Sequence, residues 1–435
     1  MLYKGGPPKG AVLSPRSTSI EELAVLVEGL GPSPRVVVSG NFATPLPVLD
    51  ALDRVVPEWT LHVLNAQPGL PHRDGVRLET CFIGPGMRDQ PTLSYVPSRL
   101  SMLPVLLQTT LPPDVVIVHT TPPRDGSVSL GTEVNILPAA IESARLRGGL
   151  VVAAVNPNMP WTYGDAVISL DLVDIIVEVA EPLRSTPPSV PDPVSQQIGA
   201  LVAARVSDGA TLQAGIGAVP DAALLGLRAR RDLGVWAEMV SDGVMGLETA
   251  GALDPTRPIV ASFMFGSEEL YRWADGNRQL TMLRTETVND PARISANPLM
   301  VSINTALEVD LFAQANGARV RSRAYSGFGG QPDFVVGALH SAGGQALIAL
   351  RSWHPRADCS TIVPLLDGPA TSFQHTAVIT EQGTAVLWGQ NQPEQARVLI
   401  DHAADPRVRD ELREEAADLG LAGPAARRER STTGG

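Results

Sequence analysis

The stretch TLQAGIGAVPDAALLGLRARRD, residues 211–232, has the pattern of a buried strand that runs through a glycine turn into an apolar-faced helix. The turn is Gly-Ile-Gly at 215–217, and Pro220 and Asp221 follow it. Proline suits the first helical turn, where its missing N–H costs nothing. Free amides at a helix start favour an anion, and glycines let a ligand approach the backbone closely. Because the full GxGxxG pattern is absent, the turn is expected either to bind an anion or simply to connect the two elements.

The same alternation of short apolar runs and amphipathic helical patterns extends along the chain in both directions. Runs rich in Val and Ile and bounded by Gly, Pro or Asn are typical of buried strands. In the first half they are RVVVSG, TLHVL, DVVIVHT, GGLVVAAVN and VDIIVEVAEP; in the second they are TLQAG, LGVWAE, PIVASF, MVSINTALEVDL, QALIAL, TAVITEQG and TAVLWG. Residues 19–30 and 137–148 have helical patterns, with Ser19 as the expected N-cap of the first. Strand–helix alternation predicts an α/β fold with mostly parallel sheets and flanking helices.

The chain has 435 residues, too many for one hydrophobic core, so two domains are expected. The alternation breaks at residues 181–193, EPLRSTPPSVPDP, which is Pro-rich and polar and is the best candidate linker. A long helix, roughly residues 194–206, then restarts the pattern. The prediction is two tandem open α/β domains, residues 1–188 and 189–421, followed by a disordered tail at 422–435.

Composition excludes several classes of function. The formal net charge is −12, and the one run of basic residues is Arg427–Arg430, so nucleic acid is not expected as a partner. Cys81 and Cys359 lie far apart, without metal-ligand spacing or a disulfide framework. The start of the chain lacks the apolar core of a signal peptide, and no apolar run is long enough to cross a membrane. We expect a cytoplasmic protein with no metal and no membrane contact.

Glu238 is the first candidate for chemistry. It ends the apolar run of DLGVWAEMVSDGVMG, residues 232–246, and a carboxylate at the end of a buried strand is costly to desolvate. If this strand is parallel to the one before the turn at 215–217, both end at the same edge of the sheet, where ligands bind. The amides of the turn would then face the carboxylate, a layout for covalent catalysis with an oxyanion hole. Glu238 could instead cap a helix or pair with an arginine.

Other polar residues have competing interpretations. Glu286, in LRTETVNDP, is expected to end a strand and is a rival nucleophile. Asp242 is expected in an Asp-Gly turn, and Glu133 as a helix-entry or packing residue. Glu381, in TEQG, suits either a site or a structural role. His119 ends a strand and is expected to be a hydrogen-bonded core histidine.

Two glycine-containing loops complete the candidates. Gly330 lies in YSGFGGQPDFVVGA, residues 325–338, which follows a strand and suits either a ligand-wrapping loop or a turn. Gly383 lies in TAVITEQGTAVLWG, residues 376–389, where one buried strand ends and another begins. Neither loop is specific by itself.

Seven segments, in order, resemble the acetyl-CoA hydrolase/transferase family, the branch of the class I CoA-transferases that includes 4-hydroxybutyrate CoA-transferase and succinyl-CoA:acetate CoA-transferase. They are TPPRDGSVSLGTEVN, VNPNMPWTYGDAVISLDLVDIIVEVAEPL, LQAGIGAVPDAAL, AEMVSDGVMGLETAGAL, VNDPARISANPLMVSINTALEVDL, SGFGGQPDFVVGA and VITEQGTAVLWG. The resemblance implies two tandem α/β domains of the class I CoA-transferase type and a glutamate nucleophile. Coenzyme A would be a substrate and not a bound cofactor, and the protein would be a homodimer or tetramer.

The resemblance also assigns site residues. The nucleophile falls on Glu238; the glutamate of the succinyl-CoA:acetate branch aligns with Thr287, one residue beyond Glu286. The CoA-binding residues fall on Gly330, Gly383 and the turn Gly215, Ile216, Gly217, Ala218 and Val219. Oxyanion-type amides would come from Val219 and Gly383.

Three positions depart from the family pattern. Trp236-Ala237 replaces a usual polar pair, Thr287 a frequent Tyr and Ala313 a usual Gly. The first two changes flank the expected acyl pocket and suggest a bulkier or more apolar acyl group. The expected reaction is ping-pong transfer of CoA from an acyl-CoA to a carboxylic acid through a glutamyl-CoA thioester. An acyl-CoA hydrolase and an inactive CoA-binding protein are the alternatives.

Overall fold

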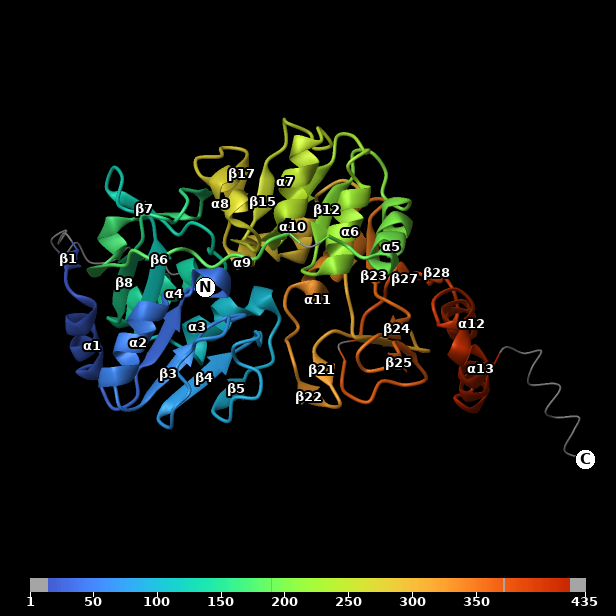
Figure 1. Cartoon of the computed structure of the whole chain (residues 1–435), viewed down its shortest axis with the longest axis horizontal. Coiled ribbons are helices and arrows are strands. Elements are labelled where there is room, and N and C mark those ends of the chain that lie inside the picture. The colour runs from blue at the N-terminus through green and yellow to red at the C-terminus, as the bar shows by residue number, and fades with distance from the viewer. Residues whose placement is uncertain (1–14, 189, 371, 423–435) are drawn as a thin grey trace, which may run out of the picture.

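Two large sheets organise the chain into two halves that lie side by side (Figure 1). The computed structural model describes residues 15–188, 190–370 and 372–422. The start of the chain, and residues 423–435 of the predicted tail, lie outside the described residues. Both sheets are flanked by helices and almost all their strands pair in parallel, so the predicted fold class is confirmed.

The first sheet has eight strands, every neighbouring pair of which is parallel. All five apolar runs predicted as strands in the first half contribute to it, because a parallel sheet covered on both faces needs continuous apolar strands. In spatial order the strands are β1 (Arg16–Ser17), β11 (Ile175–Glu178), β8 (Leu150–Val155), β6 (Val115–Thr120), β2 (Arg35–Val38), β3 (Trp59–His62), β4 (Val76–Thr80) and β5 (Leu93–Tyr95).

The second sheet has nine strands, parallel except for the terminal β27/β28 hairpin. In spatial order they are β28 (Gly383–Val386), β27 (Ala377–Thr380), β23 (Gln345–Ala349), β18 (Met300–Asn304), β12 (Thr211–Ala214), β13 (Gly234–Trp236), β15 (Ile259–Ala261), β17 (Leu280–Met282) and β9 (Tyr163–Gly164). The edge strand β9 comes from the first half of the chain and pairs with β17. The two halves therefore share a sheet edge.

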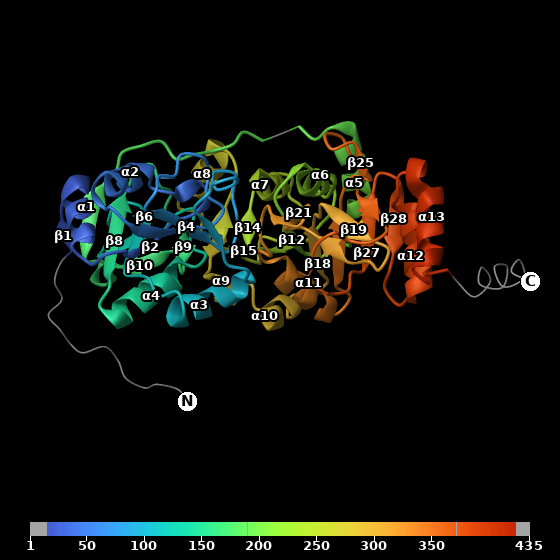
Figure 2. The same ribbon diagram turned by 90° about the horizontal axis from the view of Figure 1, so that it is seen from below.

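Helices cover both faces of the sheets. Ser19 caps the first one with a reciprocal capping box, as predicted. The helices are α1 (Ile20–Glu28), α2 (Leu46–Val55), α3 (Leu103–Thr109), α4 (Leu137–Arg147), α5 (Pro193–Ala203), α6 (Ala218–Gly226), α7 (Asp242–Thr249), α8 (Glu268–Ala274), α9 (Thr285–Val288), α10 (Pro291–Ser295), α11 (Gln331–His340), α12 (Gln392–His402) and α13 (Arg409–Asp418), with 3-10 turns η1 (Asn41–Ala43), η2 (Leu100–Met102), η3 (Leu170–Leu172) and η4 (Pro406–Val408). Figure 2 shows α6 and α7 on one face of the second sheet and α10 and α11 on the other.

Short strands outside the two sheets form small ladders. The predicted strand MVSINTALEVDL is split: its first part is β18, and its second part turns away into a separate three-stranded sheet. The remaining strands are β7 (Ser127–Ser129), β10 (Val167–Ser169), β14 (Met239–Val240), β16 (Phe263–Met264), β19 (Glu308–Asp310), β20 (Ala315–Asn316), β21 (Arg319–Val320), β22 (Arg323–Ala324), β24 (Trp353–His354), β25 (Cys359–Ser360) and β26 (Ile362–Val363).

Two local predictions were wrong. Glu286 does not end a strand but lies in α9, because β17 stops at Met282 and the Thr285 N–H bonds to the first half of the chain. The predicted Asp-Gly turn at Asp242 is instead the first turn of α7, since the Ser241 side chain caps the helix by accepting the N–H of the glycine that follows Asp242.

The chain crosses between the sheets through residues 179–192, whose described positions carry no helix or strand (Figure 2). One continuous core of apolar side chains spans both halves, with separate cores on the outer faces. Across the described residues, we find no helix with the length and apolar character needed to span a membrane.

The shared edge gives a test of how the halves are joined. Gly164 in β9 has φ +87, and a Cβ there would lie 2.5 Å from the Met282 carbonyl oxygen of β17. Gly148 is a matched control because it has φ +75 with nothing within 4 Å of a Cβ. Gly148→Ala should lower the free energy of unfolding by about 1–2 kcal/mol through backbone strain alone. Gly164→Ala should cost clearly more in urea unfolding; equal losses would show that β9 contributes nothing at this edge.

Candidate active site

Glu238 lies at the end of β13, at the edge where the parallel strands of the second sheet finish. Its side chain is half-buried. Its backbone carbonyl accepts two hydrogen bonds, from the N–H of Ser262 at 2.9 Å and of Phe263 at 3.0 Å. The residue is therefore fixed by the backbone on the adjoining segment, and its carboxylate is free to make other contacts.

The Glu238 carboxylate has two hydrogen-bond donors. Asn289 Nδ2 donates to Oε2 at 2.9 Å, and the backbone N–H of Gly330 also bonds to it. Gly330 is the N-cap residue of α11, so the positive end of this helix faces the carboxylate. A Cβ at Gly330 would overlap Glu238 Oε2 and Asn289 Nδ2. Glycine is needed here because any larger residue would collide with the Glu238 carboxylate.

Packing under α11 holds Asn289 in place. Asn289 is fully buried, directly after α9. The Trp236 indole N–H donates to the Val288 carbonyl at 2.9 Å, and the Trp236 side chain packs against the apolar cluster that contains Val288 and Phe334. Trp236, which departs from the family pattern, therefore supports the asparagine that bonds to Glu238.

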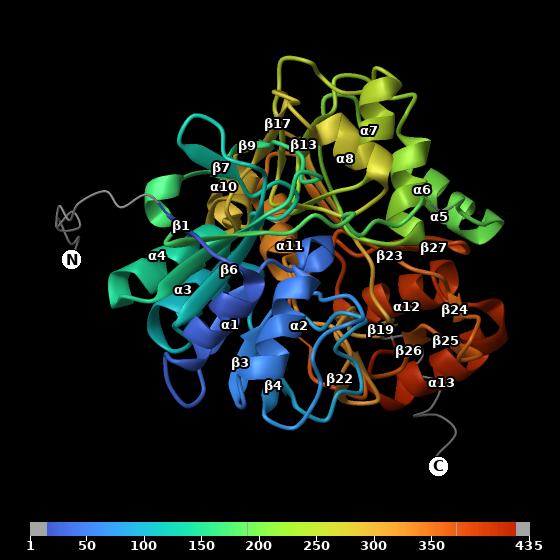
Figure 3. The ribbon, with the colours of Figure 1, turned by 60° about the vertical axis from the view of Figure 1, so that its left-hand side comes forward.

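A second carboxylate, that of Asp333, is buried in the first turn of α11. It accepts a hydrogen bond from Ser101 Oγ at 2.8 Å, and an Arg99 nitrogen lies 4.0 Å away. Both partners belong to the first half, which α11 contacts where it lies between the halves (Figures 1 and 3). Burial raises the pKa of Asp333 to about 6.

A third carboxylate, that of Glu133, comes from the first half. It is 1% exposed, and Asn41 Nδ2 donates to its Oε2 at 2.6 Å. Burial raises its pKa to about 8, and the charge of Glu238 adds to the rise. One of the two predictions for Glu133 was a packing residue. The residue is indeed buried in the fold, and its carboxyl group lies beside Glu238.

Burial also raises the pKa of Glu238, to about 7. The neighbouring charge of Asp333 pushes the pKa up, while the hydrogen bonds from Asn289 and Gly330 lower it. Glu238 is thus a carboxylate that is about half ionised near neutrality, with donors aimed at its oxygens. Such a group can act as a nucleophile, and its donors can stabilise a developing oxyanion.

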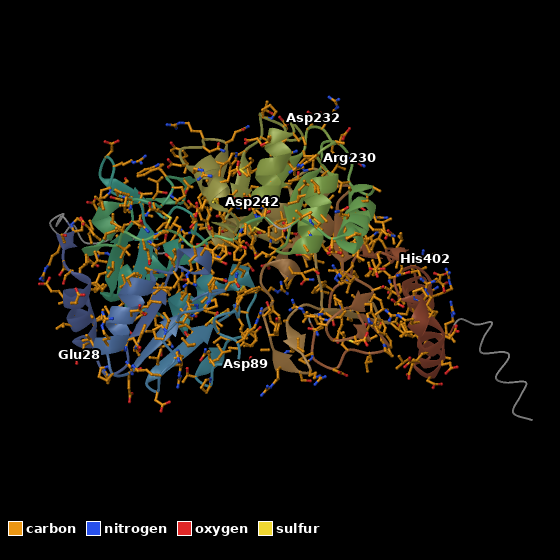
Figure 4. The ribbon with its side chains drawn as sticks, viewed as in Figure 1. Glu28, Asp89, Arg230, Asp232, Asp242 and His402 are labelled. Carbon is orange, nitrogen blue, oxygen red and sulfur yellow. The ribbon has the colours of Figure 1, made fainter. Side chains whose placement is uncertain are left out.

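The predicted binding turn at 215–219 connects β12 to α6 and ends at the same edge as Glu238, since β12 and β13 are parallel. Ile216, Gly217 and Ala218 line a cavity of about 300 Å³ together with Arg228, Asp242 and residues 186–188 of the connecting segment. Figure 4 labels Asp242 near the middle of the molecule. Within the described residues, the donors to the Glu238 carboxylate are Asn289 and Gly330, and not the amides of this turn.

The other residues that the sequence suggested as candidates lie on other elements or have other hydrogen-bond partners. Gly383 begins β28, and three strands separate its hairpin from β13. The Glu381 carboxylate accepts hydrogen bonds from the backbone N–H and hydroxyl of Ser352. Glu286 pairs with Arg284, which also binds Glu142. His119 is a buried histidine whose Nδ1 bonds to the Ala43 carbonyl, as predicted, and burial lowers its pKa to about 4.

Sequence reasoning missed Asn289, Asp333 and Asn41, and undervalued Glu133. Asn289 and Asp333 lie within VNDPARIS and GGQPDF, segments that already carried the resemblance, so polar residues inside those segments were the available signal. Asn41 had no such signal, because its role depends on contact with Glu133 across the fold.

Comparisons with known proteins show which family the chain belongs to. Models of the acetyl-CoA hydrolase/transferase N-terminal and C-terminal domains match residues 70–184 and 266–416. The 4-hydroxybutyrate coenzyme A transferase of Clostridium kluyveri is 35% identical over 88% of this chain and 93% of its own.

Solved structures give the same result. The crystal structure of 4-hydroxybutyrate CoA-transferase from Porphyromonas gingivalis, 31% identical, covers 93% of this chain and 98% of its own with a TM-score of 0.79. RipA from Yersinia pestis, 28% identical, has the same coverage and a TM-score of 0.87. The resemblance found in the sequence is confirmed: the chain belongs to the acetyl-CoA hydrolase/transferase family of enzymes.

Proposed function

We propose that this enzyme transfers CoA from an acyl-CoA to a carboxylic acid by a ping-pong mechanism in which Glu238 is the nucleophile. The observation that supports this most strongly is the environment of the Glu238 carboxylate: it lies at the strand edge, with the Asn289 amide and the N-terminus of α11 directed at it. Membership of a family whose named relatives include CoA-transferases supports the reaction class.

The proposed steps conserve every atom. The Glu238 carboxylate attacks the thioester carbonyl of the donor, and CoA thiolate leaves, giving a mixed anhydride. The thiolate then attacks the glutamyl carbonyl, forming a glutamyl-CoA thioester, and the donor acid departs with one former Glu238 oxygen. An incoming carboxylate attacks the thioester and reverses the sequence, which returns an oxygen to Glu238 and gives the new acyl-CoA.

Each attack on the glutamyl carbonyl places a negative charge on a Glu238 oxygen. The Asn289 amide and the Gly330 N–H already donate to these oxygens. They need no reorganisation to stabilise that charge, and one such donor contributes about 3–4 kcal/mol in other enzymes. We therefore assign the oxyanion role to Gly330 and Asn289, beside the Val219 amide expected from the sequence.

We assign the CoA-binding role to the turn at 215–219 and the cavity that it lines. Glycine amides at the start of α6 suit an anion, and Arg228 is the one cation among the residues lining this cavity. Gly383 begins β28, and four strands lie between β28 and β13, so we assign it to a distal part of CoA and not to the reacting carbonyl.

An acyl-CoA hydrolase is the second candidate. The half-buried side chain of Glu238 gives it some contact with solvent, and the family includes hydrolases by name. Water would then attack the glutamyl-CoA thioester in place of a carboxylate. We further propose that the protein is cytoplasmic. We also propose that it is a homodimer or tetramer, and light scattering would measure the mass of the assembly directly.

The reaction is tested by mass spectrometry after incubation with a panel of acyl-CoAs. We expect a CoA adduct on the peptide containing Glu238 that disappears when a carboxylic acid is added, and no adduct in Glu238→Ala. Glu286→Ala is the matched control and should keep the adduct, because Glu286 is held by Arg284. An adduct that decays in water regardless of added acid would favour the hydrolase. Binding without any adduct would favour an inactive CoA-binding protein.

The pH dependence tests the role of Asn289. Glu238 must be ionised to attack, so adduct formation should rise with pH through about 7. Asn289→Ala removes a hydrogen bond that favours the charged form, so the pKa and the midpoint should move upward by about one to two pH units. The exposed Asn158, which donates to the Glu181 carbonyl, is the control. A midpoint unchanged in Asn289→Ala would contradict this role.

Gly330→Ala tests close approach to Glu238. The added Cβ displaces the carboxylate and Asn289, so kcat/KM should fall by about 100-fold or more. Gly29→Ala is the control, because Gly29 also has an ordinary φ, −69, and a Cβ there meets nothing closer than 3.5 Å. Circular dichroism should show both variants folded; full activity in Gly330→Ala would disprove the contact.

A further inference from the structure

Glu133 is the centre of a buried polar cluster supplied by the first half of the chain. Asn41 donates to its carboxylate, and Asn65 donates in turn to Asn41 Oδ1 at 2.8 Å. The Asn135 side chain also bonds to Glu133. Asn41, Asn65 and Asn135 have φ of 49°, 47° and 37°. Asparagine tolerates left-handed backbone better than most non-glycine residues, so these positions suit asparagine.

Backbone pairing brings this cluster to Glu238. Glu133 forms an antiparallel bridge with Phe263, whose own N–H donates to the Glu238 carbonyl at 3.0 Å. One segment therefore lies between the two glutamates, so their backbones are about 10 Å apart, two strand spacings. The charge of Glu238 acts on the Glu133 carboxyl group, so the two side chains lie near each other.

The cluster lacks a cation. Among the described residues, Glu238 is the one charged group that acts on Glu133; its other partners, Asn41 and Asn135, are neutral, and Phe263 is apolar. Arg99 belongs to Asp333, which acts on Glu238 instead. Among the described residues, Asn135 Oδ1 is a buried hydrogen-bond acceptor without a partner.

We propose that Glu133 is a substrate-binding residue that, as a neutral acid, donates a hydrogen bond to the carboxylate of the free acid substrate. This inference rests on the proposed transfer chemistry at Glu238. The incoming acid is an anion that must reach the glutamyl carbonyl, and charged carboxylates repel each other at such distances. A carboxyl group that keeps its proton turns this repulsion into a charge-assisted hydrogen bond, which is about twice as strong as a neutral one.

The protonation of Glu133 gives the proposal a measurable signature. Its pKa is raised to about 8, so the acid is neutral at pH 7 and ionised at pH 9. In the glutamyl-CoA thioester, Glu238 carries no charge. The pKa of Glu133 is then lower than when Glu238 is ionised, because the negative charge of Glu238 raises it. Binding that needs the neutral form weakens in proportion to its fraction.

The experiment measures kcat/KM for the free acid, which reports on the second half-reaction, between pH 7 and 9. In the wild-type enzyme we expect a fall of about tenfold or more as Glu133 ionises. Glu133→Gln should change less than about twofold over this range, because an amide still donates and cannot ionise. The pH dependence of kcat/KM for the acyl-CoA should be the same in the wild-type enzyme and in Glu133→Gln.

A second variant keeps the test independent of how Glu133→Gln folds. Asn41→Gly is compatible with the φ of +49 at this position. The substitution removes a hydrogen bond that favours the ionised form of Glu133, so the pKa of Glu133 should rise. The fall in kcat/KM for the free acid should therefore occur at higher pH. A flat wild-type profile, or the same fall in Glu133→Gln, would overturn the proposal. Those results, with an intact CoA adduct on Glu238, would leave the transfer mechanism standing; loss of the adduct in the wild-type enzyme would reject that mechanism instead.

Discussion

The site depends on one junction of three backbone segments. The Ser262 N–H donates to the Glu238 carbonyl, while the Ser262 carbonyl accepts hydrogen bonds from Val134 at 3.0 Å and Asn135 at 3.1 Å. A single residue thus ties the strand end that carries Glu238 to the segment of the first half that carries Glu133. Because the bonds are between backbone groups, the spacing of the two glutamates follows from the fold and not from side-chain flexibility, as a preorganised site requires.

Placing three carboxylates around this junction costs stability, since each must be desolvated and like charges repel. The structure limits this loss of stability by giving each carboxyl group a different set of hydrogen-bond and charge partners. Asp333 has serine donors and Arg99 nearby, Glu238 has Asn289 and a helix N-terminus, and Glu133 has neutral asparagines alone. Their pKa values rise in that order, from about 6 through about 7 to about 8. At neutral pH the charge therefore lies toward α11 and the proton toward the first half.

Patterns in the sequence predicted those features of the fold that depend on residues close together in the chain. Continuous apolar runs marked the central strands, and the meeting of parallel strand ends correctly placed Glu238 at the carboxyl edge of the second sheet. Glu286 was placed wrongly because its short helix is fixed by contact with the first half, which sequence periodicity does not record. Asn289, Asp333 and Glu133 come from three elements far apart in the chain. Their convergence is a property of the packing between the halves, so no spacing in the sequence could reveal it.

In the proposed mechanism, Glu238 must be basic enough to attack a thioester and must still be ionised near neutral pH. A carboxylate with an ordinary pKa near 4.3 is a weak nucleophile toward a thioester whose leaving thiol has a pKa near 8.5. Burial raises the pKa of Glu238 to about 7, which would make it a stronger nucleophile and bring its basicity closer to that of the thiolate displaced in the proposed reaction. Burial alone would carry the pKa further and leave the group protonated and inert. The hydrogen bonds from Asn289 and Gly330 oppose that rise, so in the proposed mechanism the same contacts stabilise the oxyanion and keep the nucleophile ionised.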